Sequence, residues 1–522
     1  MSRMLKSSGA MGLATMVSRV LGLVRDQVYA AFMGTSAVAG AFQLAFTIPN
    51  LFRRLLGEGA LTAAFIPIFK EKEKNEGEIE MWRAANAVIS GLIVSAAVAV
   101  GVVLLLISVV LSSLPLPDDL ELMLRLLRIM FPYMLLVCLA AVFIGMLNSR
   151  GHFFIPALGA AMLNVVMISS VLFLAPKMGE TLDKQIFALA IGVLVAGVAQ
   201  AGFQVPLLYR DGFRHQWVSP WRNETVREVV RKMLPASVGV AAFQINVMLT
   251  QGLAFFGGAS IVATYSYAVR LMELPQGVFG VSLAMFLLPA LSGLAAEKNF
   301  VEFRATLRQG IGYLVFINAL CTVLLLALSS PIIRLLFEYK EFDAFSTMRV
   351  GFALACLAPG LVAFSLANIL ARAFYALGDV KTPMRISILC MGVNILLVIL
   401  FLFVFDLAAG GLGLASSFSS AVNVGLLFYA LRRKLKTLEL GELLRQLVPI
   451  SIAALGAGLL AWAGSQIWES RLGHESVLLR LGAVFVPMTL ATLLYFIVCW
   501  QANVPSALDI IGLLRRKLGD ER

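Results

Sequence analysis

Charged side chains are scarce in this sequence. Asp, Glu, Lys and Arg make up only 14% of its 522 residues, whereas 60% of the residues are hydrophobic and the mean hydropathy is +0.89. A soluble domain devotes about a quarter of its residues to charge. The shortage of charge therefore excludes a soluble globular protein and predicts a polytopic membrane protein.

Cysteine and histidine are also rare. The three histidines, His152, His215 and His474, are too scattered to form one set of metal ligands. The five cysteines lie inside apolar segments without a CxxC pair, which argues for small buried side chains rather than a disulfide framework. They are Cys138, Cys321, Cys356, Cys390 and Cys499. We predict no metal site and no cofactor.

Carboxylates within the apolar segments are few. A membrane-embedded enzyme acting on a lipid diphosphate needs clustered carboxylates to hold a divalent cation. The only close pair, Asp118–Asp119, follows Pro115 and Pro117 in a predicted loop. This pattern disfavours an enzyme and favours a transporter.

Apolar windows of about 20 residues predict fourteen membrane helices, so the predicted fold class is an all-α polytopic membrane protein. The predicted spans are 8–33, 36–65, 83–111, 121–148, 156–176, 186–209, 224–256, 260–295, 301–337, 343–376, 382–406, 410–433, 444–468 and 475–501. The first apolar run contains Arg19 and Arg25 and lacks a cleavage region, so we interpret it as a membrane helix rather than a signal peptide.

Basic residues accumulate in alternate loops on the side of the N-terminus, which places both termini in the cytoplasm. The opposite loops hold only Lys177, Lys184, Lys340, Arg471 and Arg480. The net charge of +12 is therefore attributed to topology, and no nucleic-acid partner is predicted. The mixed-charge run from Lys70 to Glu80 is interpreted as a solvated loop.

Proline and glycine spacing reveals an internal repeat. Pro132, Gly151 and Pro156 recur 227 residues later as Pro359, Gly378 and Pro383, Pro49 recurs 226 residues later as Pro275, and the Lys-Asn step at 74–75 recurs at 298–299. Six helices therefore repeat as six, related by an axis along the membrane normal. The predicted domains are an N-lobe (1–209, helices 1–6), a cytoplasmic linker (210–223), a C-lobe (224–436, helices 7–12), and helices 13–14 with a cytoplasmic tail (437–522).

Four arginines interrupt the segment 18–58 at membrane depth: Arg19, Arg25, Arg53 and Arg54. Arg270 lies in the matching helix of the second half. An arginine at the centre of a membrane helix costs about 2.5–3.5 kcal/mol, so it normally faces an aqueous cavity or a partner. The planar guanidinium fork suits phosphate, and an anionic ligand, a phosphate or diphosphate, is predicted.

A purely structural role stays open for each single arginine. Arg53 or Arg54 can snorkel to an interface, and Asp26, Glu58 or Glu273 can serve as structural counter-ions. These three acids are also the candidates for a buried carboxylate in an ion-coupled antiporter.

Several segments resemble the MurJ (MviN) lipid II flippases of the multidrug/oligosaccharidyl-lipid/polysaccharide exporter superfamily. They are SRVLGLVRD (18–26), IPNLFRRLLGEGAL (48–61), MLPASVGVAAFQIN (233–246), YAVRLMELPQGVFGVSL (267–283) and ARAFYALGDVKTP (371–383). The resemblance implies two six-helix lobes plus a final helix pair in a bacterial inner membrane. It also implies transport of the undecaprenyl-diphosphate-linked muropeptide to the periplasmic leaflet by alternating access, for peptidoglycan synthesis.

The resemblance places the essential arginines of the family on Arg19, Arg25, Arg53 and Arg270, with Ser18 and Glu273 as neighbours. Arg54 and Glu58 complete the predicted substrate-binding set. Two positions depart from the family, which often has Asp where this chain has Gly40 and Val269. Models of coupling or gating that use those acids are therefore in doubt here.

The predicted partners are the lipid-linked muropeptide, membrane lipid and cell-wall synthesis proteins. The alternatives left open are an exporter of another polyprenyl-linked sugar or of a drug, a membrane-embedded enzyme, and a scaffold for the cell-wall machinery.

Overall fold

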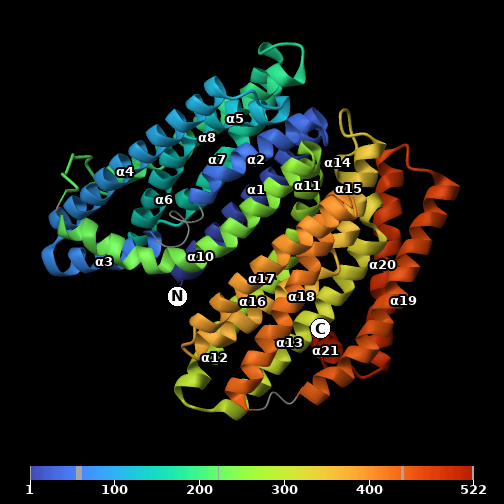
Figure 1. Ribbon diagram of the computed structural model, residues 1–522. Helices are drawn as coiled ribbons and strands as arrows, with labels where there is room; N and C mark the ends of the chain where they lie inside the picture. Colours follow the sequence, from blue (N-terminus) through green and yellow to red (C-terminus); the bar gives the residue numbers. More distant parts are fainter. Residues whose placement is uncertain (1, 54–60, 222, 437–439, 520–522) are drawn as a thin grey trace. The chain divides into compact units, whose positions relative to one another are not determined.

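The computed structural model describes residues 2–53, 61–221, 223–436 and 440–519, and within these ranges it contains helices and no β-strand (Figure 1). The all-α fold class is therefore confirmed. Arg54 and Glu58 lie outside the described residues.

Nine helical segments among the described residues are long and apolar enough to cross a membrane. They are α4 (Glu78–Ser113), α7 with η2 and η3 (Phe154–Lys177), α8 with α9 (Leu182–Arg210), α11 with η4 and α12 (Ala259–Ala296), α13 (Phe300–Ala327), α17 with η5 (Lys381–Val404), α18 (Ala408–Leu435), α19 (Leu440–Leu472) and α20 (Val477–Gln501). Two bent pairs bring the number to eleven: α5 (Asp118–Met130) with α6 (Tyr133–Ser149), and α15 (Ala344–Leu357) with α16 (Gly360–Ala376).

The other three predicted spans coincide with helices whose apolar runs contain charged or polar residues or proline. They are α1 (Ser2–Met33), α2 (Ala37–Phe52) with α3 (Leu61–Glu76), and α10 (Glu224–Gly257). Every predicted span thus overlaps helix among the described residues, and the total of fourteen crossings stays a prediction. Two short helices, α14 (Ser329–Phe337) and α21 (Pro505–Gly519), complete the described chain.

The interpretation of Lys70–Glu80 as a loop was wrong. The charged run continues α3 to Glu76, and only Gly77, at φ 89°, separates it from α4. Its charges pair along the helix: Lys70 contacts Glu73 at 2.6 Å and Lys72 contacts Glu76 at 2.5 Å. The Lys70 ammonium, together with Arg150, lowers the pKa of Glu73. Local ion pairs therefore extend the helix beyond its apolar part.

The repeat is visible in the backbone. Pro132 precedes α6 at a bend of 42°, and Pro359 precedes α16 at a bend of 46°. Proline cannot donate to the preceding turn, and this explains a break at the same place in both halves. Each pair of helices then continues toward a glycine, Gly151 or Gly378.

Both glycines adopt left-handed backbone conformations, with φ 87° at Gly151 and 72° at Gly378. The following amide donates to the carbonyl five residues back: His152 N to Leu147 O and Asp379 N to Phe374 O, both at 2.9 Å. This is a Schellman cap, which the φ > 0 of glycine permits. The 227-residue spacing therefore reflects one repeated helix ending.

The Lys-Asn pair at 74–75 and 298–299 lies close to corresponding helix junctions, that of α3 with α4 and that of α12 with α13, but in different conformations. Lys74 and Asn75 lie within α3, whereas Lys298 forms a turn at φ 56° and Asn299 caps α13 by accepting from Glu302 N. The two copies of this marker therefore differ in local structure, and their equivalence in the repeat stays a prediction.

The chain divides by its contacts into two compact units, residues 1–263 with 339–341, and residues 264–338 with 342–522. Helix α11 begins in the first unit and ends in the second. The lobes predicted from the repeat are defined differently, by sequence equivalence rather than by packing, and they stay a prediction.

An aromatic ladder holds part of the first unit. Phe65 and Phe69 of α3 lie 5.3 Å apart between ring centroids, Trp82 of α4 follows at 5.6 Å, and Phe213 follows Trp82 at 5.6 Å. These rings are buried. The ladder ties the segment after α9 to α3 and α4, and Asn86 reinforces it by donating to Arg214 O at 2.9 Å.

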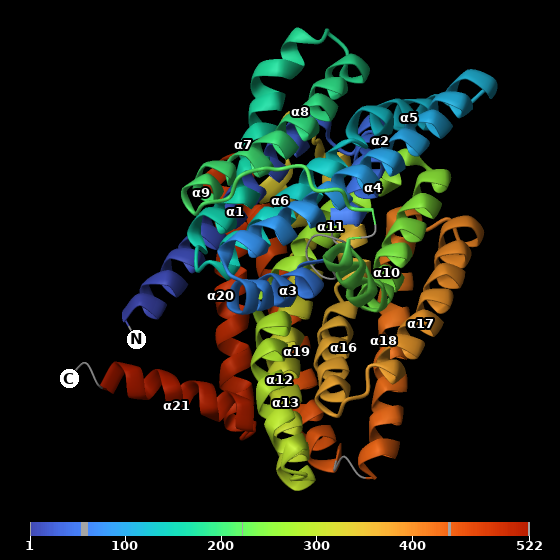
Figure 2. The same ribbon diagram turned by 90° about the vertical axis from the view of Figure 1, so that its left-hand side faces the viewer.

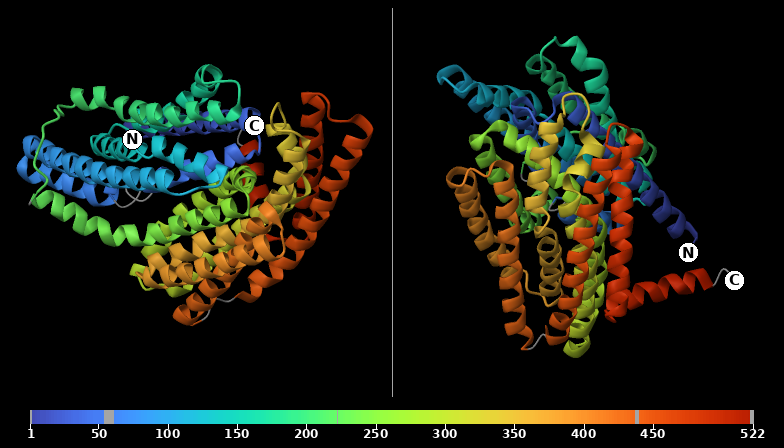
Figure 3. Two further views of the ribbon diagram at one scale, coloured as in Figure 1. Left: turned by 45° about the horizontal axis from the view of Figure 1, so that its top comes forward. Right: turned by 90° about the vertical axis from the view of Figure 1, so that its right-hand side faces the viewer.

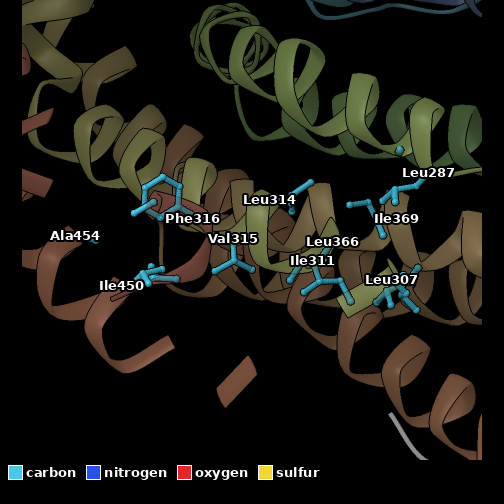
Figure 4. Packing of buried hydrophobic residues seen from close by; sticks show 14 of the residues in the cluster. Leu287, Leu307, Ile311, Leu314, Val315, Phe316, Leu366, Ile369, Ile450 and Ala454 are labelled. Carbon is cyan, nitrogen blue, oxygen red and sulfur yellow. The ribbon is translucent and has the colours of Figure 1, made fainter. Parts of the chain in front are cut away.

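The core of the second unit is built around α13. Figure 4 shows Leu307, Ile311, Leu314 and Val315 of α13 beside Leu366 and Ile369 of α16, with Ile450 and Ala454 of α19 nearby. Helices α19 and α20 lie side by side (Figure 3), and α21 leaves the end of α20 at an angle (Figure 2). The final helix pair is therefore packed on the second unit through α13.

An ionic network also joins this final pair to α14. Arg334 donates to Glu469 at 2.5 Å and lies 3.5 Å from Glu338, and Arg480 lies 3.4 Å from Glu338. Thr347 donates to the same Glu338 carboxylate at 2.7 Å. All four charged side chains are less than one-quarter exposed. Glu338 is therefore the shared partner that connects α14 with α20.

Gly40 of α2, where the family often has Asp, lies very close to the backbone of α11. A Cβ built on Gly40 would lie 1.8 Å from Ala259 O, at the start of α11. A contact with a backbone carbonyl cannot be relieved by a rotamer change. Only glycine therefore allows α2 and α11 to cross as they do.

We expect Gly40→Ala to destabilise the protein by at least about 1–3 kcal/mol, because the added methyl overpacks the crossing. Gly252→Ala in α10 is the matched control, since nothing lies within 4 Å of its added Cβ. Thermal unfolding of the purified variants in detergent measures the difference. Equal melting temperatures for the two variants would contradict the close crossing.

We expect Glu338→Gln to destabilise the second unit by about 1–3 kcal/mol, because two partly buried arginines lose their charged acceptor. The control is Glu80→Gln, whose carboxylate pairs with the 69% exposed Arg83 at 3.4 Å and should contribute little. The same melting measurement applies. A Glu338→Gln variant as stable as the control would show that the network adds nothing.

Candidate functional site

Arg25 is the best-anchored of the predicted arginines. Its Nε and Nη2 donate to Asp26 Oδ1 at 3.1 and 2.7 Å, and its Nη1 donates to Asn164 Oδ1 of α7 at 2.9 Å. The Arg25 and Asp26 side chains are only 12% and 14% exposed. The apolar environment makes such partners necessary, because an unpaired charge there is costly. Arg25 is therefore held in one orientation.

Asn164 fixes this arrangement from the neighbouring helix. Its Nδ2 donates to Ser18 O of α1 at 3.1 Å while its Oδ1 accepts from Arg25. Helices α1 and α7 lie side by side (Figure 1). One buried amide thus bonds two points of α1 that are seven residues apart. Ser18 contributes to the site through its backbone carbonyl.

Aromatic rings continue from Arg25 into the first unit. The Arg25 guanidinium lies 5.6 Å from the centre of the Tyr29 ring, which meets Phe42 of α2 edge-on at 6.0 Å. Phe42 stacks with Phe46, and Phe46 contacts Tyr133 of α6. A cation near an aromatic face is stabilised by the ring quadrupole. The rings give Arg25 a rigid support on the side of α2.

Arg19 differs from Arg25 in having an exposed side chain. Within the described residues it has no hydrogen bond or ion pair. It lies six residues from Arg25 on α1, which corresponds to about 9 Å along the helix. α1 therefore carries one anchored arginine and one that is available to a ligand.

Arg53 lies half-buried just after α2, and its Nε donates to Asn50 Oδ1 at 2.7 Å. Phe52 beside it packs edge-on against Phe131, next to the bend between α5 and α6. Arg53 is therefore placed where α2 meets this bend. Arg54 and Glu58 fall in the segment 54–60, which lies outside the described residues.

Arg270 belongs to α11 in the second unit. It is half-exposed, and its Nη1 lies 3.3 Å from Glu273 Oε2 one turn further along. The preceding turn is firmly packed, since Tyr265 is buried and its hydroxyl lies 3.0 Å from Ser416 Oγ of α18. The backbone of α11 is thus fixed while the Arg270 guanidinium faces outward.

The structure brings Ser18, Arg25 and Asp26 together with Asn164 in the first unit, and it pairs Arg270 with Glu273 in the second. The arginines and acids were predicted from the sequence, whereas Asn164 was not predicted to belong to the site. Its only signal was an amide inside an apolar span, which predicts an interhelical hydrogen bond without naming the partner.

The described residues contain no group of three or more His, Cys, Asp or Glu side chains placed to hold a metal ion. The chemistry that the site offers is instead that of guanidinium groups, each able to donate two parallel hydrogen bonds to an oxyanion.

Comparisons with known proteins point to one family. The family profile described as "Lipid II flippase MurJ" matches residues 29–482. "Probable lipid II flippase MurJ" of Rhizobium tropici is 35% identical over 533 residues, covering 98% of this chain and 96% of that protein. "Lipid II flippase MurJ" of Burkholderia cenocepacia is 33% identical over 498 residues, covering 93% and 95%.

Solved structures share the fold. One described as "Lipid II flippase MurJ, inward closed conformation" has a TM-score of 0.75 at 22% identity and covers 97% of this chain and 99% of that one. A multidrug resistance MATE family transporter in an inward-facing conformation has a TM-score of 0.66 at 17% identity, covering 83% and 99%. The profile and the curated relatives extend over most of the sequence, and the chain therefore belongs to the lipid II flippase MurJ family.

Proposed function

We propose that this chain transports lipid II, the undecaprenyl-diphosphate-linked muropeptide, from the cytoplasmic to the periplasmic leaflet by alternating access. The observation that carries the proposal is the pair of arginines on α1, with Arg25 held by Asp26 and Asn164 and Arg19 exposed. Family membership supplies the substrate class. In this role the chain is a transporter, not an enzyme.

The two arginines of α1 suit different parts of such a task. Arg19 binds a diphosphate oxygen directly, because its donors are available. Arg25 adds a fixed positive charge about 9 Å away along the helix. A ligand phosphate that approaches Arg25 has to replace Asp26 as acceptor, so binding exchanges one anionic partner for another. Such an exchange lets the guanidinium release its ligand again.

Arg270 supplies a further cation, since its side chain is half-exposed and its pairing with the half-exposed Glu273 at 3.3 Å is weakened by solvent. Arg53 is also included in the proposed substrate-binding set, because its half-buried guanidinium lies at the end of α2. Arg54 and Glu58 remain in the proposed set on the sequence pattern alone.

The proposed location is the bacterial inner membrane, with both termini in the cytoplasm. Support comes from the excess of basic residues in alternate loops, which retain the more positive side in the cytoplasm. Cell-wall synthesis proteins are proposed partners because they produce and consume the lipid-linked precursor.

We expect Arg25→Ala or Arg270→Ala to lower lipid II flipping in reconstituted vesicles by at least about 10- to 100-fold. The reason is that a hydrogen bond to a charged group is worth about 1.5–3 kcal/mol. Arg83→Ala is the control, since this arginine lies near the start of α4 and its side chain is 69% exposed.

Because Arg270 is half-exposed, its removal tests binding without a folding defect, and melting temperatures check this for both variants. Full flipping activity in both variants would refute the diphosphate proposal. Activity lost for lipid II and kept for another polyprenyl-linked sugar or a drug would redirect the proposal to that substrate.

We expect Asn164→Ala to weaken flipping by about tenfold, because Arg25 loses its acceptor on α7 and can turn toward Asp26 alone. Asn368→Ala is the matched control, since the Asn368 amide donates only to Phe364 O of its own helix, at 3.2 Å. Binding of lipid II to purified protein, titrated in parallel, separates an affinity effect from a rate effect. Equal results for the two asparagine variants would exclude a positioning role for Asn164.

A further inference from the structure

A second basic site lies in the first unit, away from the arginines of α1. A cavity of about 410 Å³ opens between the last turns of α4, helix α5 and the start of α8. Its polar lining consists of Ser108, Ser112, Glu121, Arg125 and Arg128, and Phe187 contributes an apolar wall. No binding role was predicted for this region from the sequence.

Helix α5 presents its charged face to this cavity. Glu121, Arg125 and Arg128 follow the spacing i, i+4, i+7 and so lie on one side of the helix. The opposite side buries Met123, Leu126, Leu127 and Met130 against the rest of the first unit. The arginines are therefore directed outward by an amphipathic helix whose other face is fixed in the core.

The charges of the cavity do not cancel. Arg125 pairs with Glu121, which leaves Arg128. The Arg128 side chain is exposed, and it makes no hydrogen bond or ion pair with any part of the chain that the structure describes. The cavity therefore has room for a ligand and one uncompensated positive charge.

An apolar stripe leads along α4 to the same cavity. Val98, Val102, Leu105 and Val109 recur at helical spacing and are 62%, 51%, 65% and 52% exposed. Ser112, one turn beyond Val109, lines the cavity. In a membrane such a stripe faces lipid chains. A basic cavity at the end of it fits an amphiphile whose headgroup is anionic.

We propose that this cavity binds the phosphodiester headgroup of an anionic glycerophospholipid, with an acyl chain along the α4 stripe. Arg128 donates to the phosphate, Arg125 adds a second donor while it stays paired with Glu121, and the serine hydroxyls face the glycerol. A net charge of −1 on the lipid matches the single uncompensated charge. This proposal does not depend on lipid II transport, since it concerns a different ligand at a different place.

The test is native mass spectrometry of the purified full chain with phosphatidylglycerol, measuring the affinity of the first bound lipid. We expect Arg128→Gln to lower this affinity by about tenfold and Arg128→Lys to retain most of it, because lysine keeps the charge. Arg83→Gln, at the other end of α4, should bind as the unaltered protein does. Melting temperatures should be equal, since Arg128 is exposed.

Two further comparisons identify the ligand. Phosphatidylethanolamine should bind more weakly than phosphatidylglycerol, because its ammonium group cancels the charge of the phosphate. Leu105→Ser should weaken long-chain phosphatidylglycerol more than a short-chain analogue. The proposal is overturned if Arg128→Gln binds like Arg83→Gln, if the two lipids bind equally, or if inorganic phosphate at millimolar concentration displaces the lipid, which would indicate a site for free phosphate.

Discussion

A guanidinium placed deep in an apolar helix needs hydrogen-bond acceptors within the protein. This need determines how Arg25 is held. Asp26 on its own helix and Asn164 on α7 together accept from three of its nitrogens. Since Asn164 also binds Ser18 O, the requirement of one charge sets the register between α1 and α7. The same requirement explains why Arg25, which is buried, is held by two acceptors, whereas Arg19, which is exposed, is not. The proposed anion site therefore combines an arginine that the protein holds by hydrogen bonds with an exposed arginine on the same helix.

The fold was predictable where its cause is local. Apolar windows located the spans that are long and apolar enough to cross a membrane, because the length needed is fixed by the bilayer. Pro132 and Pro359 correctly predicted matching helix breaks in the two halves, because proline removes a backbone donor, although prolines elsewhere in the chain lie inside continuous helices. The site was predictable only by residue type. The arginines were visible as misplaced charges, whereas their partner Asn164 lies 139 residues from Arg25, and no local pattern announces that contact. The helical run Lys70–Glu76 was missed because ion pairs, rather than apolar periodicity, hold it.

One basic residue that departs from the positive-inside pattern has structural partners in the second unit. Arg480 was counted among the few basic residues on the side away from the termini. It donates to Glu338 O at 2.9 Å and approaches the Glu338 carboxylate, which Arg334 also contacts. The final helices α19 and α20 are thus joined to α14 by the same rule that governs α1, namely that a charge at low exposure needs an internal partner.

The close crossing of α2 and α11 at Gly40 excludes one candidate acid. The resemblance to the family suggested an acid at this position, yet the approach of Ala259 O leaves no space for any Cβ. Coupling through a carboxylate at residue 40 is therefore impossible with this crossing of α2 and α11. Of the acids that the structure describes, Asp26 and Glu273 lie beside these arginines, and each is bonded to an arginine of the proposed site. An anion that binds Arg25 or Arg270 therefore competes with a carboxylate of the protein. Residue 40 takes no part in this competition, because the crossing of α2 and α11 leaves no space there for a side chain.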